Sequence, residues 1–555
     1  MQSSRLAAER ARMATCPLLP GLLALLVVLG CAPLSGDPEG YTYVCGTAAD
    51  RSLVVVGDHV TFGGGAICGE GDAKLPPEPR MPDAVCQTLV ADKSTPDENR
   101  LDTARVQAAL TACKGGGAVK LVAGGANNAF ITSALAVDSV ILWVDKGVTL
   151  YASRNPDLYQ KTGSCGVAGA SDSDGCVPFI SVSGTKPGIV GDGAIDGQGG
   201  EPLVNRDYSW WQLSGALRST NGSIGNPQLI NLNTGTTGFL MYRITLYDSP
   251  KFHVKITSNP PDGTCDTAGE GYTVWGITIL TPSKQFNSQG LLMTPHFARN
   301  TDGVDPGTTN TATCGVIACN TISTGDDQIA IKGGHLVKNL IIAHNHFGTG
   351  HGMSIGSETY GEVTGQAGPE RGVQDIDIYD LTIDADSRSV GHDGTDADFN
   401  GIRIKSDISR GGLVDNIVYR DVCMRDMNNA ILISTAYNPL FSGSYYPEFR
   451  RVDFQNVRHV NCMSDVQTVV TIEGHSSARR TGPVRLDNVI MDNIGPHAVA
   501  AEYADIELGP GPVNFMPGGR DVTVVNNMAG GGEPQHCVFP TLPAPRLPEG
   551  WLRGP

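Results

Sequence analysis

The sequence is poor in aromatic side chains and in charge. Phe, Trp and Tyr make up 6% of its 555 residues, and Asp, Glu, Lys and Arg together make up 17%. So little charge, combined with 70 glycines, excludes a coiled coil. Cations are scarcer than anions, 40 against 57, and the net charge of −17 argues against a nucleic-acid-binding protein. The hydrophobic fraction of 40% is nevertheless high enough to bury a large core, so the chain is not a disordered polymer.

Long hydrophobic runs are missing except near the N-terminus. There, the apolar stretch Leu18 to Leu29 follows three basic residues, Arg5, Arg10 and Arg12. The stretch is too short to span a bilayer and predicts a signal peptide over residues 1–30. It ends in Val28-Leu29-Gly30-Cys31, which resembles a bacterial lipobox and would attach the protein to a membrane, facing outward, through a lipid on Cys31. The alternative is an ordinary signal peptide, cleaved a few residues later, and a secreted protein.

The cysteines fit an exported protein. Of the 14 cysteines, Cys16 leaves with the signal, and lipidation of Cys31 would leave an even dozen for disulfides. The local pairs that we expect first are Cys165 with Cys176 and Cys314 with Cys319. No CxxC pairs recur and no histidines stand at ligand spacing, so we expect no zinc site.

The chain divides into few parts. Residues 31–95 are rich in Gly, Pro and Cys and predict only an irregular or short-stranded segment. Residues 101–110 predict one short helix, which Asp102 or Thr103 could cap and the glycines at 115–117 would end. We expect the main domain over residues 96–540 and a tail over residues 541–555.

Many short β-rich runs follow the helix, separated by Gly, Asn and Asp. Three of them are alike, at residues 337–342, 373–378 and 414–419. A second set of strands interleaves with these, at residues 328–331, 352–355, 401–404 and 430–433. Short strands and a tight interval, such as the one from Ile331 to Ile355, predict an all-β parallel β-helix, with the helix covering one open end. The alternative, a β-propeller, would show a Trp-Asp or Gly-rich blade signature, which is missing.

Three clusters of polar residues recur at the period of the coil. The interval from Asp302 to Asp326, and the one from Asp326 to His351, match the interval from Ile331 to Ile355 almost to the residue. At one coil per interval these side chains meet at one angular position, because neighbouring strands lie about 4.7–4.9 Å apart. Because successive side chains of a strand point to opposite faces, Arg403 and Lys405 point to the same side, and Ile402 and Ile404 point inward.

Carboxyl groups so close together cannot all keep ordinary pKa values. Repulsion between Asp302, Asp326 and Asp327 predicts one protonated acid beside an ionised base, the division that glycoside hydrolysis needs. Arg403 and Lys405 beside them favour a substrate that carries a carboxylate, and therefore an acidic sugar.

At these residues the sequence resembles the polygalacturonases, the pectin-degrading glycoside hydrolases of family 28. The matching elements come in the same order and cover roughly residues 95–500: Asn300-Thr301-Asp302-Gly303, Gly325-Asp326-Asp327, Gly350-His351-Gly352 and Arg403-Ile404-Lys405, supported by residues 193–199, Trp210-Trp211 and Ser249-Pro250. The resemblance implies a right-handed parallel β-helix that hydrolyses the α-1,4 bonds of polygalacturonate with inversion. It also implies a hydrolase that works without cofactor or metal, and we expect a monomer.

The resemblance also implies the roles of the candidate residues. Asp326 would be the general acid, Asp302 and Asp327 would activate water, and His351 would tune the protonation of the acid. Arg403 and Lys405 would bind the galacturonate carboxylate. Tyr437 would contact the substrate, and Asn300 would orient the strand end or a sugar hydroxyl.

The chain departs from the family in two places. Gln328 replaces a cysteine that often follows the aspartate pair, and we expect it to lie away from the chemistry. The loop between His351 and Arg403 is long and acidic. The spacing also conflicts with the resemblance. Carboxylates about 5 Å apart predict hydrolysis with retention of the anomeric configuration, whereas the family hydrolyses with inversion.

Other functions stay open at this point. A pectate lyase also uses a β-helix but needs calcium and a strong base, and a rhamnogalacturonan hydrolase would share the fold. A polysaccharide-binding β-helix without activity is the alternative from another class. The sequence also leaves open endo against exo cleavage and whether Trp210 and Trp211 stack on sugars or pack in the core.

Overall fold

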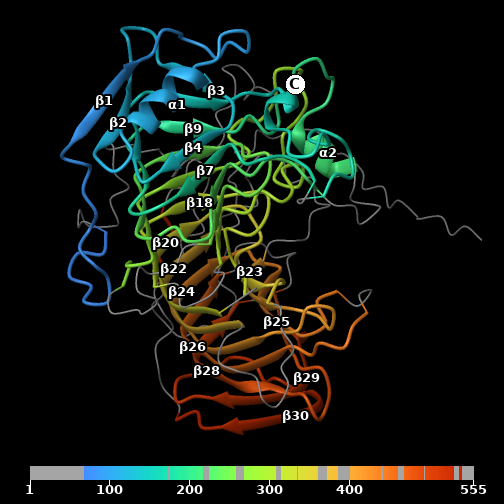
Figure 1. The fold of residues 1–555 in the computed structure, drawn as a ribbon. Coiled ribbons are helices and arrows are strands. Elements are labelled where there is room, and N and C mark those ends of the chain that lie inside the picture. The colour runs from blue at the N-terminus through green and yellow to red at the C-terminus, as the bar shows by residue number, and fades with distance from the viewer. Residues whose placement is uncertain are drawn as a thin grey trace, which may run out of the picture. The chain divides into compact units, whose positions relative to one another are not determined.

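Short parallel strands stack coil upon coil from β1 to β30 (Figure 1). This computed structural model describes residues 68–171, 174–216, 224–257, 268–307, 314–333, 336–359, 372–384, 400–438, 442–460, 468–492, 494–529 and 537–540. All of them belong to one unit, Leu53–Pro555. The predicted signal peptide 1–30, Cys31 and the tail 541–555 lie outside the described residues.

Each coil contributes one strand to each of three faces, here called faces A, B and C, in that order along the chain. Face A contains β1 (Val85–Val90), β2 (Ala118–Val122), β5 (Ile141–Val144), β8 (Gly188–Val190), β11 (Phe239–Tyr242), β14 (Tyr272–Trp275) and β17 (Gly315–Ala318). Face B contains β3 (Ala129–Thr132), β6 (Thr149–Ala152), β9 (Ala194–Asp196), β12 (Thr245–Tyr247), β15 (Thr278–Leu280) and β18 (Thr321–Ser323).

Face C carries the candidate site. It contains β4 (Leu135–Asp138), β7 (Ile180–Ser183), β10 (Ile230–Leu232), β13 (Val254–Ile256), β16 (Val304–Pro306), β19 (Ile329–Ile331), β21 (Met353–Gly356), β23 (Asn400–Lys405), β25 (Asn429–Ser434), β27 (Thr468–Glu473) and the start of β29 (Ile494–Leu508). In the later coils one long strand supplies both A and B: β20 (Leu336–Phe347), β22 (Gly372–Asp384), β24 (Leu413–Arg425), β26 (Glu448–Val460) and β28 (Thr481–Met491). The last strand, β30 (Gly519–Asn526), pairs with β29.

The strands of each face pair in parallel, which confirms the predicted parallel β-helix and excludes a propeller, whose blades are antiparallel; connections between parallel strands are right-handed as a rule. The three alike runs lie on face A in register, with Val337 opposite Val373 and Val373 opposite Val414. The interleaved set forms face C, where Ile355 pairs with Ile331 on one side and with Ile404 on the other. Because β1 pairs with β2, the stack already begins within the segment 31–95.

Asn and Asp residues bend the chain at fixed places. The third residue of each alike run has a positive φ: 58° at Asn339, 54° at Asp375 and 60° at Asn416. Asn and Asp adopt this left-handed conformation more readily than other side chains. The amide of Asn416 also donates to Oδ1 of Asp375 at 2.6 Å, so polar side chains on successive coils hold one another.

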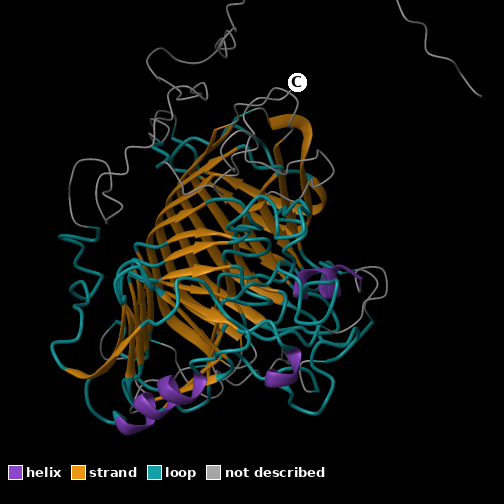
Figure 2. Ribbon diagram, turned by 90° about the horizontal axis from the view of Figure 1, so that it is seen from above, coloured by secondary structure: helices purple, strands orange, loops and turns teal. Residues whose placement is uncertain are grey.

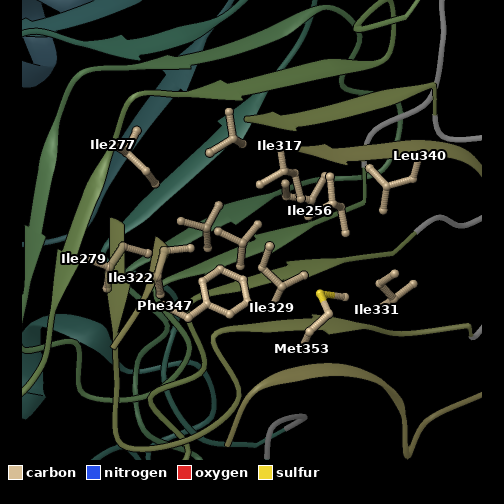
Figure 3. Close-up of a cluster of buried hydrophobic side chains, with 14 of the residues drawn as sticks. Ile256, Ile277, Ile279, Ile317, Ile322, Ile329, Ile331, Leu340, Phe347 and Met353 are labelled. Carbon is tan, nitrogen blue, oxygen red and sulfur yellow. The ribbon is translucent and has the colours of Figure 1, made fainter. Parts of the chain in front are cut away.

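Apolar side chains from all three faces fill the interior of the coils. Figure 3 shows the part beside the candidate site, where Ile322 and Phe347 from face B meet Ile329 and Met353 from face C. These four side chains are completely buried. Each such side chain contributes about 1.5–3 kcal/mol of transfer free energy, and together they fix the inward register of the strands.

The predicted capping helix is present as α1 (Thr103–Ala112), and helices lie at the margin of the stacked strands (Figure 2). Its buried face, which includes Val106 and Leu110, packs on the first coils. Asp102 stands at the N-cap but its side chain forms no capping hydrogen bond. Its buried carboxylate instead pairs with Lys93 at 2.8 Å and accepts the amide of Ile131 at 2.9 Å, so it attaches the helix to β3.

A second helix, α2 (Trp210–Ala216), was not predicted, and a 3₁₀ turn, η1, spans Pro156–Tyr159. Trp210 and Trp211 are at most 1% exposed, and the indole of Trp211 donates to the carbonyl of Ser249 at 2.8 Å. The pair therefore has a core role and does not stack on sugars. Among the described residues, no helix combines the length and the apolar character needed to cross a membrane.

Disulfides join Cys68 to Cys319, Cys86 to Cys113, Cys165 to Cys176 and Cys423 to Cys537. The local pair Cys165–Cys176 was predicted correctly. The pair Cys314–Cys319 was wrong, because Cys319 bonds to Cys68 and Cys314 forms another disulfide. The extended strand β17 lies between the two and holds them about 16 Å apart, well beyond the reach of a disulfide.

Candidate active site

Four of the predicted residues lie at the corner where face B passes into face C. Asp302 comes just before β16, Asp326 and Asp327 before β19, and His351 before β21. Backbone hydrogen bonds hold these turns together: the amide of Gly303 donates to the carbonyl of Asp327 at 2.9 Å, and the amide of His351 donates to the carbonyl of Asp326 at 2.9 Å. The interval of one coil does bring these side chains to one corner, as the sequence predicted.

The turn before Asp302 is fixed by its neighbours. The buried hydroxyl of Thr301 donates to the carbonyl of Ala298 at 2.6 Å and accepts the amide of Gly325 at 3.0 Å. Asn300, which has a φ of 55°, donates its backbone amide to Oδ2 of Asp326 at 3.2 Å. Asn300 therefore contacts the cluster through its backbone amide.

Arg403 and Lys405 both contact Asp327. They project outward from β23 while Ile402 and Ile404 are completely buried in the core. The Lys405 ammonium is 2.9 Å from Oδ2 of Asp327, and the Arg403 guanidinium pairs with Oδ1. Burial opposes ionisation of Asp327, but the charges of Arg403 and Lys405 outweigh it and lower its pKa to about 2. The prediction assigned these cations to the substrate and did not foresee that Asp327 binds them.

Asp326 is the carboxyl that reaches solvent. Its side chain is 19% exposed, against 4% for Asp302 and 2% for Asp327. Oδ1 of Asp326 accepts the amide of Asp327 at 2.9 Å and lies 3.0 Å from Nδ1 of His351. Burial alone would raise the pKa of Asp326. The charge and hydrogen bond of His351, with the more distant cations of Lys405 and Arg403, hold it below the ordinary value instead.

Asp302 is in the opposite electrostatic situation. Burial and the nearby charges of Asp305 and Asp326 raise its pKa well above the ordinary value, and Lys332, 3.4 Å away, offsets this only in part. Its Oδ1 is buried and has no hydrogen-bond partner among the described residues. The corner thus combines one carboxyl group that tends to be protonated, Asp302, with two that tend to be ionised, Asp326 and Asp327. Hydrolysis requires such a separation of acid and base.

The sequence interpretation missed an ionic network next to Asp302. The Lys332 ammonium, just after β19, lies 3.2 Å from Glu358 as well as 3.4 Å from Asp302. Asp305 on β16 faces the same lysine, and burial raises its pKa to about 7 against the attraction of Lys332. Lys332 and Glu358 stand close to one coil apart in the sequence, so the same periodicity could have revealed the pair.

Two polar residues that were not assigned a role hold the reacting groups in place. Ser354 donates to Oδ1 of Asp327 at 2.8 Å and accepts from Nε of Arg403 at 3.2 Å. Gln328 contacts no reacting group, as expected, but its side chain donates to the carbonyl of Gly348 at 2.7 Å and accepts the amide of Gly352 at 2.5 Å. Gln328 therefore fixes the turn that carries His351.

Tyr437, which the resemblance suggested as a substrate contact, lies beside Lys405. Its ring centre is 5.1 Å from the Lys405 ammonium, and its amide donates to the carbonyl of Ser406 at 3.0 Å. The side chain is 41% exposed, so its ring faces solvent next to the buried cations.

The corner also contains the donor atoms of a possible cation site. Ligand atoms of Asp326, Asp327 and His351 lie within 4.8 Å of one another. Arg403 and Lys405 already neutralise Asp327, however, and two fixed positive charges at this distance repel a metal ion. The donor set therefore fits a resident cation poorly, which disfavours calcium-dependent elimination.

A substitution at Gly352 tests how tightly the turn that carries His351 is packed. Its φ is +87°, and an added Cβ would lie 2.0 Å from the carbonyl oxygen of Gly401. We expect Gly352→Ala to lower the free energy of unfolding by about 3 kcal/mol and to reduce activity, because backbone must move. Gly116→Ala is the matched control, since that position has open space and no positive φ. Equal denaturation midpoints for the two variants would contradict this packing.

The sequence is also similar to that of known proteins. Residues 162–508 match the family described as glycosyl hydrolases family 28. A polygalacturonase of Ralstonia nicotianae is 38% identical over 483 residues, which cover 80% of this chain and 84% of that protein. An endo-polygalacturonase of Pectobacterium parmentieri is 37% identical and covers 75% and 89% of the two chains.

Solved structures show the same fold. The polygalacturonase of Erwinia carotovora ssp. carotovora superposes with a TM-score of 0.56 at 30% identity, covering 82% of this chain and 97% of the other. An exopolygalacturonase of Thermotoga maritima, at 15% identity, has a TM-score of 0.52 over 80% and 93% of the two chains. At this low identity, the similarity to the Thermotoga maritima protein shows the fold alone.

Proposed function

Because this chain belongs to glycosyl hydrolases family 28, and is a glycoside hydrolase, we propose that it cleaves the α-1,4 bonds of polygalacturonate with inversion. The observation that carries this proposal is the corner itself, where three carboxyls with divergent pKa values lie against two buried cations. Acid and base together supply the proton transfers, and the cations suit a sugar that carries a carboxylate.

In the proposed reaction Asp326 donates a proton to the leaving oxygen, because it is the exposed carboxyl and His351 orients it. Asp302 and Asp327 hold and activate the water that attacks the anomeric carbon. Water adds to that carbon as the glycosidic bond breaks, and its proton passes to Asp302. Tyr437 contacts the sugar bound at Arg403 and Lys405, and Asn300 keeps Asp326 in place through its amide.

The protonation of the cluster changes when substrate binds. In the substrate-free protein the proton favours Asp302, whose pKa is raised, over Asp326, whose pKa is lowered. A galacturonate carboxylate at Arg403 and Lys405 would cancel part of their positive charge, which is one cause of the low pKa of Asp326. Binding therefore moves the shared proton towards Asp326, where the leaving group needs it.

This proton sharing predicts a pH effect. Since Asp302 retains the proton as the pH rises past the ordinary range of a carboxyl group, the wild-type kcat/KM should fall only at a pH well above that range. In Asp302→Asn the proton can reside only on Asp326, whose pKa is lowered, so the residual activity should be lost at lower pH. The pH profiles of kcat/KM of the two proteins measure this shift. If both profiles fall at the same alkaline pH, Asp302 and Asp326 do not share the proton.

Digestion of polygalacturonate tests the proposed activity. We expect new reducing ends without the ultraviolet absorbance of an unsaturated uronate, and no dependence on added calcium or on a chelator. Unsaturated products would identify a lyase, and binding without cleavage would identify a non-catalytic protein. Rhamnogalacturonan as the preferred polymer would change the substrate but not the reaction. The lengths of the products separate endo from exo cleavage.

We also propose that the protein is exported and works as a monomer outside the cytoplasm, either secreted or lipid-anchored at Cys31. The disulfides of the described residues support an oxidising compartment. The division into a signal peptide 1–30 and a catalytic domain over residues 96–540 belongs to the same proposal. Mass analysis of the mature N-terminus distinguishes lipid on Cys31 from cleavage further along.

A further inference from the structure

The outward positions of face C form a row that passes under the active site. Lys255 on β13 is in register with Asp305 on the next strand, β16. The same row reaches Arg403 on β23, four strands away from β13. Their inward neighbours Val254 and Ile402 are completely buried. Side chains alternate along a strand, so Lys255 projects to the same side of the sheet as Arg403.

Lys255 and Arg403 lie on opposite sides of the reacting carboxyls. Asp302 comes just before β16, and Asp326 and Asp327 just before β19, both between β13 and β23 in the stack. With strands about 4.7–4.9 Å apart, the α-carbons of Lys255 and Arg403 are about 19 Å apart. A chain of sugars that runs along face C therefore passes Lys255, the carboxyls and Arg403 in turn.

Lys255 has no ionic partner among the residues that the structure describes. Other cations near the site are paired: Lys332 with Asp302 and Glu358, and both Arg403 and Lys405 with Asp327. No hydrogen bond or ion pair of the Lys255 ammonium is found within the described part of the chain, although Asp305 is the adjacent residue in the sheet. Lys255 is half-buried, whereas its neighbours on the strand, Val254 and Ile256, are fully buried.

We propose that Lys255 binds the carboxylate of a galacturonate unit on the other side of the scissile bond from Arg403 and Lys405. This inference rests on the proposed function, because it assumes a polyuronate bound along face C. The repeat of a 1,4-linked pyranose chain is close to the spacing of parallel strands, so one uronate lies near each strand. An anionic substrate approaching a protein with a net charge of −17 needs such a cation at each end of the site.

Removal of the charge should weaken binding and leave the chemical step alone. We expect Lys255→Gln to raise KM for polygalacturonate about 3- to 10-fold, with kcat within about 2-fold, and Lys255→Arg to keep most of the affinity. Methyl-esterified pectin lacks the charge, so its KM should not change. Lys114→Gln is the matched control, because it removes one lysine charge beside α1 at an exposed pair with Asp138.

Binding of oligogalacturonate to the Asp326→Asn protein separates this proposal from the proposed function. If Lys255→Gln on that background lowers the affinity more than Lys114→Gln does, the subsite is supported. Equal affinities, or an equal rise in KM on the esterified polymer, would overturn the subsite while hydrolysis by the wild type stands. A wild type that fails to cleave polygalacturonate would instead overturn the proposed function.

Discussion

Asp326→Asn is expected to lower kcat on polygalacturonate by about 10²- to 10⁴-fold, the usual contribution of a general acid. The asparagine keeps the shape of the side chain and can still accept the amide of Asp327, so the turn should stay folded. The loss has one cause, namely that no proton reaches the leaving oxygen. Turnover measured beside the denaturation midpoint checks both parts of this expectation.

A substrate with a better leaving group shows whether Asp326 is the general acid. An oligogalacturonide with an activated aryl group at its reducing end needs little protonation, so Asp326→Asn should lose far less activity on it than on the polymer. Asp302→Asn removes the base instead and should lose activity on both substrates alike. The reverse pattern would assign the acid to Asp302, which holds the proton in the substrate-free protein.

Arg403→Met is expected to lower the free energy of unfolding by about 1.5–3 kcal/mol and to impair activity severely. The substitution removes a charged hydrogen-bond donor from the carboxylate of Asp327, whose side chain is only 2% exposed. Lys405 would remain beside Asp327 at 2.9 Å but could not replace the guanidinium bond to Oδ1. Denaturant unfolding and kcat/KM measure the two losses.

A second substitution separates the charge effect from a simple loss of packing. Adding Lys405→Met to Arg403→Met leaves the buried charge of Asp327 with neither of its two cations, so the double variant should lose more stability than the two single variants added together. Arg520→Met is the matched control, because its pair with Glu502 is exposed and worth at most about 1 kcal/mol. If the losses of the two single variants simply add in the double variant, the charge of Asp327 is not what Arg403 stabilises.

Much of the fold followed from periodicity. Ile331, Ile355 and Ile404 predicted the register of face C because each inward position must be apolar on every coil. The disulfide between Cys68 and Cys319 could not be predicted in this way, since 251 residues separate the two cysteines. A periodic pattern reports the angle around the coil, but it does not tell which distant segment covers the outside of the sheet.

The candidate site was predictable in position but not in its internal contacts. The same interval placed Asp302, Asp326 and His351 at one corner, yet it gave no sign that Arg403 and Lys405 would pair with Asp327. Long side chains choose among several carboxylates within reach, and that choice depends on burial, which a sequence does not display. Lys332 and Glu358 were missed for a different reason, because each alone reads as an ordinary exposed charge.

The configuration of the first product tests the central claim, that carboxyls on successive coils hydrolyse the bond by single displacement. Proton NMR during digestion of an oligogalacturonate follows the new reducing end before it mutarotates. Attack by water on the face opposite the leaving oxygen predicts the β anomer first, with the α anomer growing in later. An initial α anomer would contradict the assigned roles, because it requires a covalent intermediate on one of the carboxylates.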